Sequence, residues 1–583
     1  MTRGIACLAA IVLLASSASP QPRRNIVIFV ADGLRRASVN AADAPTLFQI
    51  RTDGVDFINS HSVYPTLTMP NAAAIATGHY PGDTGLFANN VFIGQPLFAS
   101  NGSNRLPGSV TPNFENNQVL ADINTRYGGN FLGETSLLSI ARMLGYNTAA
   151  IGKEGPTALQ DPSMAVDASA PRPPSRNLRA LVDEAVGRIL PEFIKSGKPF
   201  LLLFWSPEPD ATQHNHNDGL GSLTPGINGP ASLAAVQAVD ESLKQLLDYL
   251  KSQPAVYANT DVLVTSDHGF SSVSRRQVDG QGRATTSYSA TFTYRNASGQ
   301  VESTDGSLPG GHISIDLAQG LNLPLYDPDA QVMNVGGMST FVPVDPTIGQ
   351  QTSQRRQRPL GGGLIGGTGR VRPSDAKVIV AGSSIYVPDR DPATVRRIVN
   401  IFSRQDYVGA IFVHDSFGRV PGSLPMSAIG MVGTASLPEP AVIVTPRTFA
   451  LNPSDPLRTS IIVTGVGGIG QGQHGALSRA ETMNNMAAIG PDFRRHFVDA
   501  APVSNADLPV TVMSLLGAAM HNRGTLAGRI LREVLPAGST GPTATSVTLQ
   551  SDPSEVGKRT ILIYQQIGMQ HYLDRACYES TRC

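Results

Sequence analysis

The sequence contains little cysteine and little charge, and each shortage removes a class of protein. Only three of the 583 residues are cysteine, and their spacing is not that of a Cys-based metal site. Any metal must therefore be held by histidine and carboxylate side chains. Charged residues make up 15% of the chain, and 45 basic residues balance 45 acidic ones. No electrostatic surface therefore favours nucleic acid or an anionic membrane.

The chain also lacks an apolar run long enough to cross a bilayer. The run at residues 5–14 has ten residues, whereas a spanning helix needs about 20. Because Arg3 precedes this run and small residues follow it at 16–18, residues 1–18 are predicted to be a cleaved secretory signal. An uncleaved anchor or a buried strand is the alternative. We expect a secreted or periplasmic protein without a transmembrane anchor, in which Cys577 and Cys583 are free to form a disulfide.

The apolar residues that are present predict alternating strands and helices. Residues 25–30, 200–205 and 262–265 are short, continuous apolar runs, which is typical of strands buried on both faces of a parallel sheet. Residues 178–193 and 232–250 have apolar side chains at helical spacing. The predicted fold class is α/β, an α/β/α sandwich with a mostly parallel sheet.

A change of character after residue 274 predicts an inserted region. We assign residues 25–274 and 461–535 to one catalytic domain, 275–460 to an inserted α+β cap, and 536–583 to a C-terminal extension. Within the cap we expect a strand at residues 286–294, a mobile loop at 349–372 and a helix at 392–403. The sheet is expected to resume near Ser460, and a further strand is expected at residues 560–564.

Acidic residues stand where three of the predicted strands end. Asp32 follows the first strand, Asp210 follows the second, and Asp267-His268 follows the third. Open α/β sheets bind ligands at the carboxyl ends of their strands. His214 lies four residues after Asp210, which places both side chains on one helical face. Each residue alone has an ordinary explanation, as a turn, a helix cap or a structural histidine; the set of positions favours a metal site.

Thr68 and His474 complete the pattern. Thr68 lies at the start of a predicted helix, where free backbone amides and the helix dipole suit a phosphoryl group. Helix capping is the alternative role for Thr68, and Thr66 is a nearby competitor for the role of nucleophile. His474 lies in a glycine-rich turn that allows close approach of backbone to a site. His216 is close to His214 but off its helical phase.

These motifs together resemble the type I phosphodiesterase/nucleotide pyrophosphatase family of the alkaline phosphatase superfamily. The motifs are Asp32-Gly, Thr68-Met-Pro-Asn, Asp210-Ala-Thr-Gln-His214, Ser-Asp267-His268-Gly and Gln-His474-Gly, in the family's order and spacing. The resemblance covers about residues 25–275 and 460–535, and it implies an alkaline-phosphatase-like fold with hydrolysis of small-molecule phosphoesters.

The resemblance also implies two zinc ions and a covalent mechanism. One zinc would be held by Asp210, His214 and His474, and the other by Asp32, Asp267 and His268 together with Thr68. The Thr68 hydroxyl would attack phosphorus and form a phosphothreonine intermediate. Asn89 matches the family asparagine that donates to a phosphoryl oxygen, with Asn90 as a competitor. Ala88 and the pair Ala72-Ala73 depart from the family pattern.

The sequence leaves two alternatives to a phosphodiesterase. Family monoesterases carry a Lys-x-Arg pair that binds the second phosphate charge. Here Lys153 is present and Gly155 stands at the arginine position, so diesters are favoured and a monoesterase using Lys153 remains the alternative. Lys153 could instead be a solvated lysine paired with Glu154. A non-catalytic binding protein of the same fold is the other alternative. It would be expected to lack at least one metal-binding residue, and all six metal-binding Asp and His residues are present.

Overall fold

The structure is a computed structural model, and it describes most of the chain between residues 23 and 579. The segments outside the description are 1–22, 98–108, 161–176, 217, 219–221, 296–300, 329–332, 336–337, 346–349, 352–360, 371–374, 539–540 and 580–583. The predicted signal at residues 1–18 and Cys583 lie outside the described residues. Cys577 is disulfide-bonded. No helix among the described residues is long and apolar enough to cross a membrane.

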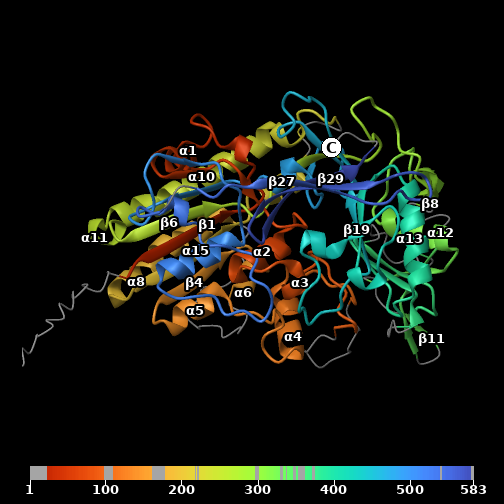
Figure 1. The fold of residues 1–583 in the computed structure, drawn as a ribbon, viewed down its shortest axis with the longest axis horizontal. Coiled ribbons are helices and arrows are strands. Elements are labelled where there is room, and N and C mark those ends of the chain that lie inside the picture. Colours follow the sequence, from red (N-terminus) through yellow and green to blue (C-terminus); the bar gives the residue numbers. More distant parts are fainter. Residues whose placement is uncertain are drawn as a thin grey trace, which may run out of the picture.

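A seven-stranded sheet forms the centre of the first half of the molecule (Figure 1). Its order is β25 (Phe497–Asp499), β2 (Val55–Phe57), β24 (Met486–Ile489), β6 (Thr260–Thr265), β1 (Asn25–Ala31), β5 (Phe200–Ser206) and β4 (Asn147–Gly152). β6, β1, β5 and β4 run parallel, and β2 and β25 also pair in parallel. β24 is antiparallel to both of its neighbours. The sheet is therefore mostly parallel.

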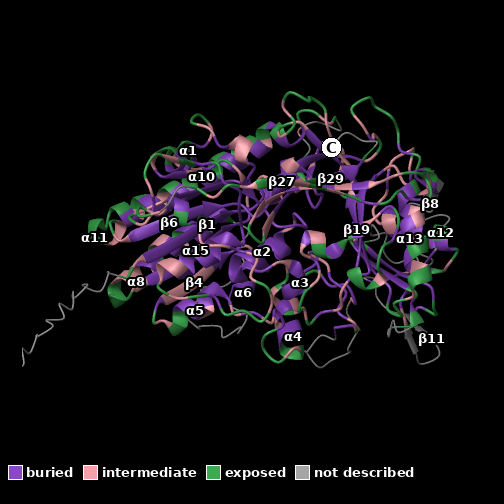
Figure 2. Ribbon diagram, viewed as in Figure 1, coloured by how far each residue is buried: buried purple, intermediate pink, exposed green. Residues whose placement is uncertain are grey.

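Alternation along β1 explains why both faces of this sheet are covered. Ile26, Ile28 and Val30 pack in one hydrophobic core, and Val27 and Phe29 pack in another. Helices α2 (Thr68–Thr77), α5 (Leu137–Met143) and α15 (Asp507–Leu515) contribute to the first core. Helices α1 (Pro45–Asp53), α7 (Leu178–Glu184) and α10 (Pro230–Lys251) contribute to the second. The buried strands lie between these layers (Figure 2), which confirms the predicted α/β/α sandwich.

A second, nine-stranded sheet lies in the other half of the molecule (Figure 1). Its order is β14 (Gln350–Gln351), β13 (Val342–Asp345), β10 (Leu325–Asp327), β15 (Gly362–Ile365), β16 (Val378–Ala381), β17 (Ser384–Tyr386), β20 (Val442–Pro446), β18 (Val408–Val413) and β19 (Leu424–Pro425). Helices α12 (His312–Leu321) and α13 (Pro392–Arg404) share a hydrophobic core with it. This half falls within the region expected to be an inserted cap.

Three local expectations in and around this region differ from the structure. The strand expected at 286–294 contains a 3-10 turn, η4 (Tyr288–Thr291), where the Ser287 hydroxyl accepts a hydrogen bond from the Ser289 amide, and only its last two residues belong to a strand, β8 (Thr293–Arg295). Residues 349, 352–360 and 371–372 of the loop expected at 349–372 lie outside the described residues, and its described part contains the buried strand β15, where Gly363 lets the backbone approach Ser314. The strand β22 (Ser460–Val463) pairs with β7 (Ser271–Ser274) in a separate four-stranded sheet, and the central sheet resumes at β24.

The C-terminal segment connects the two halves. It forms a three-stranded antiparallel sheet of β27 (Thr545–Gln550), β28 (Thr560–Ile567) and β29 (Gln570–Tyr578), which extends across the molecule in Figure 1. Leu562 and Leu573 belong to the core of the first half, and Tyr578 belongs to the core of the second. The strand predicted at residues 560–564 is thus part of β28.

Candidate active site

Four of the predicted residues meet because their strands end at the same edge of the central sheet. β1 pairs with β5 up to Ala31 and Ser206, and with β6 up to Val30 and Thr265. Asp32 directly follows β1, while Asp267 and His268 follow β6. Asp210 begins helix α9 (Asp210–Asn215) after β5, and its amide donates to the Asp32 carbonyl at 3.1 Å. The carboxyl ends of the parallel strands therefore deliver all four side chains to one place.

Asp210, His214 and His474 form a compact triangle of potential ligand atoms. Asp210 Oδ1 lies 3.1 Å from His214 Nε2 and 3.3 Å from His474 Nε2, and the two imidazole nitrogens are 3.1 Å apart. Ligand atoms on a tetrahedral zinc ion are separated by about 3.3–3.5 Å, given bonds of about 2.0–2.15 Å. The triangle therefore has the size of one face of a zinc coordination shell.

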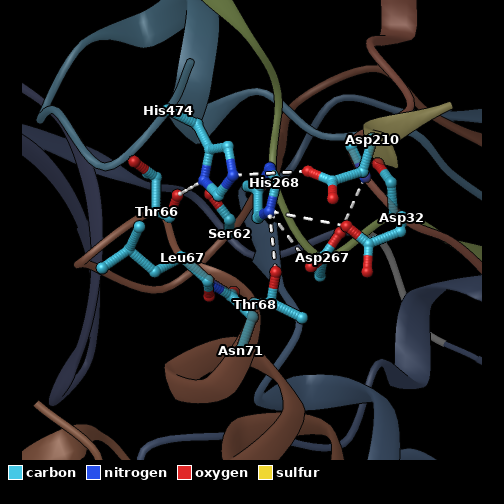
Figure 3. Close-up of polar contacts among 12 residues, drawn as sticks. Asp32, Ser62, Thr66, Leu67, Thr68, Asn71, Asp210, Asp267, His268 and His474 are labelled. Carbon is cyan, nitrogen blue, oxygen red and sulfur yellow. Dashed lines mark hydrogen bonds and ion pairs between the residues drawn. The ribbon is translucent and has the colours of Figure 1, made fainter. Parts of the chain in front are cut away.

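Asp32, Asp267 and His268 form a second group directly beside the first. His268 Nε2 lies 3.2 Å from Asp267 Oδ2 and 3.8 Å from Asp32 Oδ1. The imidazole rings of His268 and His474 stack with centroids 3.6 Å apart, so the two groups are in contact (Figure 3). Each group offers three protein ligands for one divalent cation, which leaves positions open for substrate.

Backbone carbonyls fix the orientation of all three imidazoles. The Nδ1 atoms of His214, His268 and His474 lie 3.1, 3.0 and 2.7 Å from the carbonyl oxygens of Gly472, Gly269 and Thr66. A carbonyl can only accept, so each Nδ1 carries the proton and each Nε2 presents its lone pair to the cluster. Histidines that bind a metal through one ring nitrogen are commonly oriented in this way by a hydrogen bond from the other ring nitrogen.

Three carboxylate oxygens at the centre of the cluster lack hydrogen-bond donors. Asp32 Oδ1, Asp210 Oδ1 and Asp267 Oδ2 are buried and accept no hydrogen bond within the described part of the chain. The opposite oxygens are engaged: Asp32 Oδ2 accepts from Trp205 Nε1 at 2.7 Å, and Asp267 Oδ1 accepts from the Gly33 amide at 2.9 Å. Buried carboxylate oxygens are rarely left unpaired, and divalent cations would satisfy all three. The donor set therefore fits the implied metals.

The pKa values of Asp32, His268 and His474 are shifted because charged groups are buried close together in the cluster. Burial, together with Asp210 and Asp267, raises the pKa of Asp32 well above its usual range. Burial and the neighbouring His268 lower the pKa of His474 to about 3, so its imidazole is neutral. Burial lowers the pKa of His268, but Asp267 and Asp32 outweigh burial and raise it to about 9, so a cation that binds at its Nε2 would displace a proton from that atom. A cation at the centre would relieve the repulsion among the carboxylates.

The Thr68 hydroxyl faces the cluster (Figure 3). Thr68 is fully buried as the first residue of α2, and its Oγ1 lies 3.4 Å from both His268 Nε2 and Lys153 Nζ. The N-cap residue is Leu67, and no side chain caps this helix, so the capping role considered for Thr68 is wrong. The competitor Thr66 donates to the Ala476 carbonyl at 2.8 Å. Of these two hydroxyls, Thr68 is therefore the one that lies against the cluster.

Lys153 contacts the Thr68 hydroxyl and two of the carboxylates. Lys153 Nζ is 3.0 Å from Asp32 Oδ2 and 3.0 Å from Asp210 Oδ2. The alternative of a solvated lysine paired with Glu154 is therefore wrong. Burial lowers the pKa of Lys153, but Asp210 and Asp32 raise it well above its usual range, so the ammonium stays charged.

Asn89 meets the start of helix α2. Its Oδ1 accepts from the Met69 amide at 2.9 Å. The competitor Asn90 instead donates to the Thr111 carbonyl at 3.1 Å. The competitor His216 ends helix α9 and is exposed.

A cavity of about 330 Å³ extends from the cluster to the second sheet. Asp210, His214 and His474 line one end, and Asn89 lies on its wall. The opposite wall comes from α12 and from the strands β16, β17, β18 and β20. A site at the boundary of two sheets, apolar with a few polar groups, is the usual form of a small-molecule pocket.

Two residues of the site were not predicted from the sequence. Trp205 is the only tryptophan, and its indole N–H holds Asp32; its position at the end of a strand-like run was the available signal. Glu115 lines the cavity and its Oε1 accepts from Asn89 Nδ2 at 2.6 Å. Glu115 lies in an irregular segment, and no sequence pattern marked it.

A mostly parallel sheet with these side chains at its carboxyl edge is the arrangement of alkaline-phosphatase-like α/β/α proteins. Residues 26–289 match the model of the type I phosphodiesterase/nucleotide pyrophosphatase family. This match covers a little less than half of the chain, and it supports the family that the motifs indicated.

Individual relatives are distant and longer. The chain is 22% identical over 255 residues to venom phosphodiesterase 2 of Crotalus adamanteus, covering 43% of this chain and 27% of the relative. It is 22% identical over 260 residues to mouse ectonucleotide pyrophosphatase/phosphodiesterase family member 3, covering 44% and 26%. The matches thus span about a quarter of these relatives. Among solved structures, the chain is similar to human ectonucleotide pyrophosphatase/phosphodiesterase 5. The superposition covers 88% of this chain and 100% of the human chain, with 15% sequence identity and a TM-score of 0.48.

Proposed function

We propose that this protein is a two-zinc phosphoester hydrolase of the phosphodiesterase/nucleotide pyrophosphatase type. The observation that carries the proposal is the convergence of three unpaired carboxylate oxygens and three imidazole Nε2 atoms beside the buried Thr68 hydroxyl. One zinc would be bound by Asp210, His214 and His474, and the other by Asp32, Asp267 and His268. Bound zinc supplies Lewis-acid stabilisation of the attacking and leaving oxygens.

The residues of the chain define the covalent step. The Thr68 hydroxyl loses its proton and its oxygen forms a bond to phosphorus while the bond to the leaving oxygen breaks in line; the leaving oxygen takes up a proton and departs as an alcohol or phosphate, and the phosphoryl group on Thr68 keeps its other substituent. Water then attacks phosphorus, which releases the phosphomonoester and restores the Thr68 hydroxyl. In this proposal Lys153 and the Asn89 amide hold non-bridging phosphoryl oxygens, and the N-terminus of α2 adds a favourable dipole.

The cavity supports a small-molecule phosphoester with a substantial leaving group. Aromatic and aliphatic walls, including Tyr64, Phe87 and Tyr407, suit a nucleoside, lipid or sugar portion. Lys153 is the observation that favours the second candidate, an alkaline phosphomonoesterase, because it adds a positive charge beside Thr68. A secreted or periplasmic location is part of the proposal, and it accords with relatives named as venom and ecto-enzymes.

The deciding experiment compares bis-p-nitrophenyl phosphate with p-nitrophenyl phosphate, with added zinc and with a chelator. We expect faster cleavage of the diester, loss of activity with the chelator, and activity that rises toward alkaline pH because the Thr68 hydroxyl must lose its proton. Faster cleavage of the monoester would assign the second candidate. Bound zinc without cleavage of either ester would identify a binding protein, and an optimum below pH 6 would contradict the proposed nucleophile.

A further inference from the structure

Glu115 is a carboxylate that contacts both of the residues placed to hold the phosphoryl oxygens. Its Oε1 accepts a hydrogen bond from Asn89 Nδ2 at 2.6 Å, and its Oε2 lies 3.7 Å from Lys153 Nζ. The side chain is 23% exposed and lines the cavity. An acidic group is not needed to hold either partner, since Lys153 already pairs with Asp32 and Asp210.

The backbone around Glu115 is built to bring this carboxylate to the site. The Phe114 amide donates to the Asn89 carbonyl at 2.8 Å, and the Glu115 amide donates to Asn113 Oδ1 at 2.7 Å. Gly155 has φ of +88°, and a Cβ there would lie 2.5 Å from Glu115 Cα. The absence of a side chain two residues after Lys153 therefore makes room for the segment that carries Glu115.

The position of Glu115 has a consequence for the charge of the ligand. A phosphodiester carries one negative charge, whereas a phosphomonoester carries close to two above its second pKa of about 6. A carboxylate beside the phosphoryl-binding groups repels the second charge more than the first, and the low dielectric of a partly buried site strengthens that repulsion. Glu115 also offsets part of the positive charge of Lys153, which is the feature that would favour a dianion.

We propose that Glu115 is a specificity-determining residue that selects monoanionic phosphodiesters against dianionic phosphomonoesters. The inference rests on the proposed function, because it assigns the substrate class of the same site. It also explains how the site can contain Lys153 and still prefer diesters. The ligand class it predicts is a phosphoryl group with a single negative charge and two organic substituents.

The test is the variant Glu115→Gln, which keeps an acceptor for Asn89 and removes the charge. At pH 8.5, we expect the ratio of kcat/KM for p-nitrophenyl phosphate to that for bis-p-nitrophenyl phosphate to rise on the order of tenfold. The affinity of zinc-loaded protein for inorganic phosphate, measured by calorimetry, should rise by a similar factor. Glu154→Gln is the matched control, since Glu154 accepts from the Asn117 amide at 3.1 Å; it should leave both quantities unchanged.

Each other outcome has a definite meaning. An unchanged ratio and an unchanged phosphate affinity in a folded variant would overturn the proposal. Equal losses for both esters, with unchanged phosphate affinity, would make Glu115 a positioning residue for Asn89 and would also overturn it. If Glu115→Gln does not fold, Glu115→Ser repeats the comparison. If the wild-type protein cleaves neither ester, the proposed function fails, and the calorimetric comparison still tests the effect of Glu115 on dianion binding.

Discussion

At the scale of single residues, the Thr68 hydroxyl is the group to which we assign the covalent step of the proposed function. We expect Thr68→Ala to lower kcat on bis-p-nitrophenyl phosphate by roughly 10³-fold or more, because the nucleophile is lost while the remaining ligands stay in place. Zinc content, measured by atomic absorption, should be nearly unchanged. Thr77→Ala is the control in the same helix, where the hydroxyl donates to the Ala73 carbonyl; it should retain activity. Loss of both zinc ions from Thr68→Ala would instead make Thr68 a structural ligand.

The residues of the candidate metal site could be predicted from the sequence. Six acidic and histidine side chains were predicted to share a site, and the structure places them in two adjacent groups. They could be predicted because each follows a strand-like run, and strand ends in a parallel sheet meet at one edge. Glu115 could not be predicted, because its place depends on the backbone contact with Gly155 and on no local pattern.

At the scale of secondary-structure elements, β6 contains a buried acid outside the site. Asp261 is fully buried, its Oδ1 accepts from the Asp492 amide at 3.1 Å, and its Oδ2 has no donor among the described residues. Burial and the nearby Asp492 raise the pKa of Asp261 to about 7. A carboxyl group with a raised folded-state pKa stabilises the fold at low pH and loses that contribution as pH rises from about 4 through 7.

The variant Asp261→Asn is therefore expected to become more stable than the wild type as pH rises. The free energies of unfolding in urea should be similar near pH 4 and should differ by up to about 4 kcal/mol near pH 8.5, since the pKa difference is about three units. Asp248→Asn, which removes an exposed carboxylate from α10, should show no such trend. A gap that does not widen between pH 4 and pH 8.5 would show that Asp261 is not held protonated.

Helices were easier to predict than short strands. The apolar periodicity at residues 232–250 and 392–403 corresponds to α10 and α13, because an amphipathic helix must bury one face along its whole length. The segment at 286–294 has an alternating pattern, but hydrogen bonds from Ser287 and Ser289 to Asp316 override it. Those bonds come from residues about 30 positions away, so local sequence could not reveal them.

At the scale of the whole molecule, the second sheet supplies one wall of the catalytic cavity. Composition indicated a separate region after residue 274, but it could not indicate which of its surfaces faces the site. Gly382, Ser383 and Ser384 form the turn between β16 and β17 that lines the cavity, and the Ser383 carbonyl accepts from the Val444 amide at 3.1 Å. This turn faces the same space as His214 and His474. It is therefore placed to contact the organic portion of a substrate.

The variant Ser383→Trp tests that arrangement. The cavity measures about 330 Å³, so an indole projecting into it would take up much of the space for a leaving group. We expect KM for bis-p-nitrophenyl phosphate to rise about tenfold, with zinc content and inhibition by inorganic phosphate unchanged, because the small anion needs only the end of the cavity at the metal ligands. Gln319→Trp, an exposed position on α12 in the same half of the molecule, is the control. If both variants behaved like the wild type, the leaving group would have to bind away from the second sheet, and the catalytic half alone would determine which esters are cleaved.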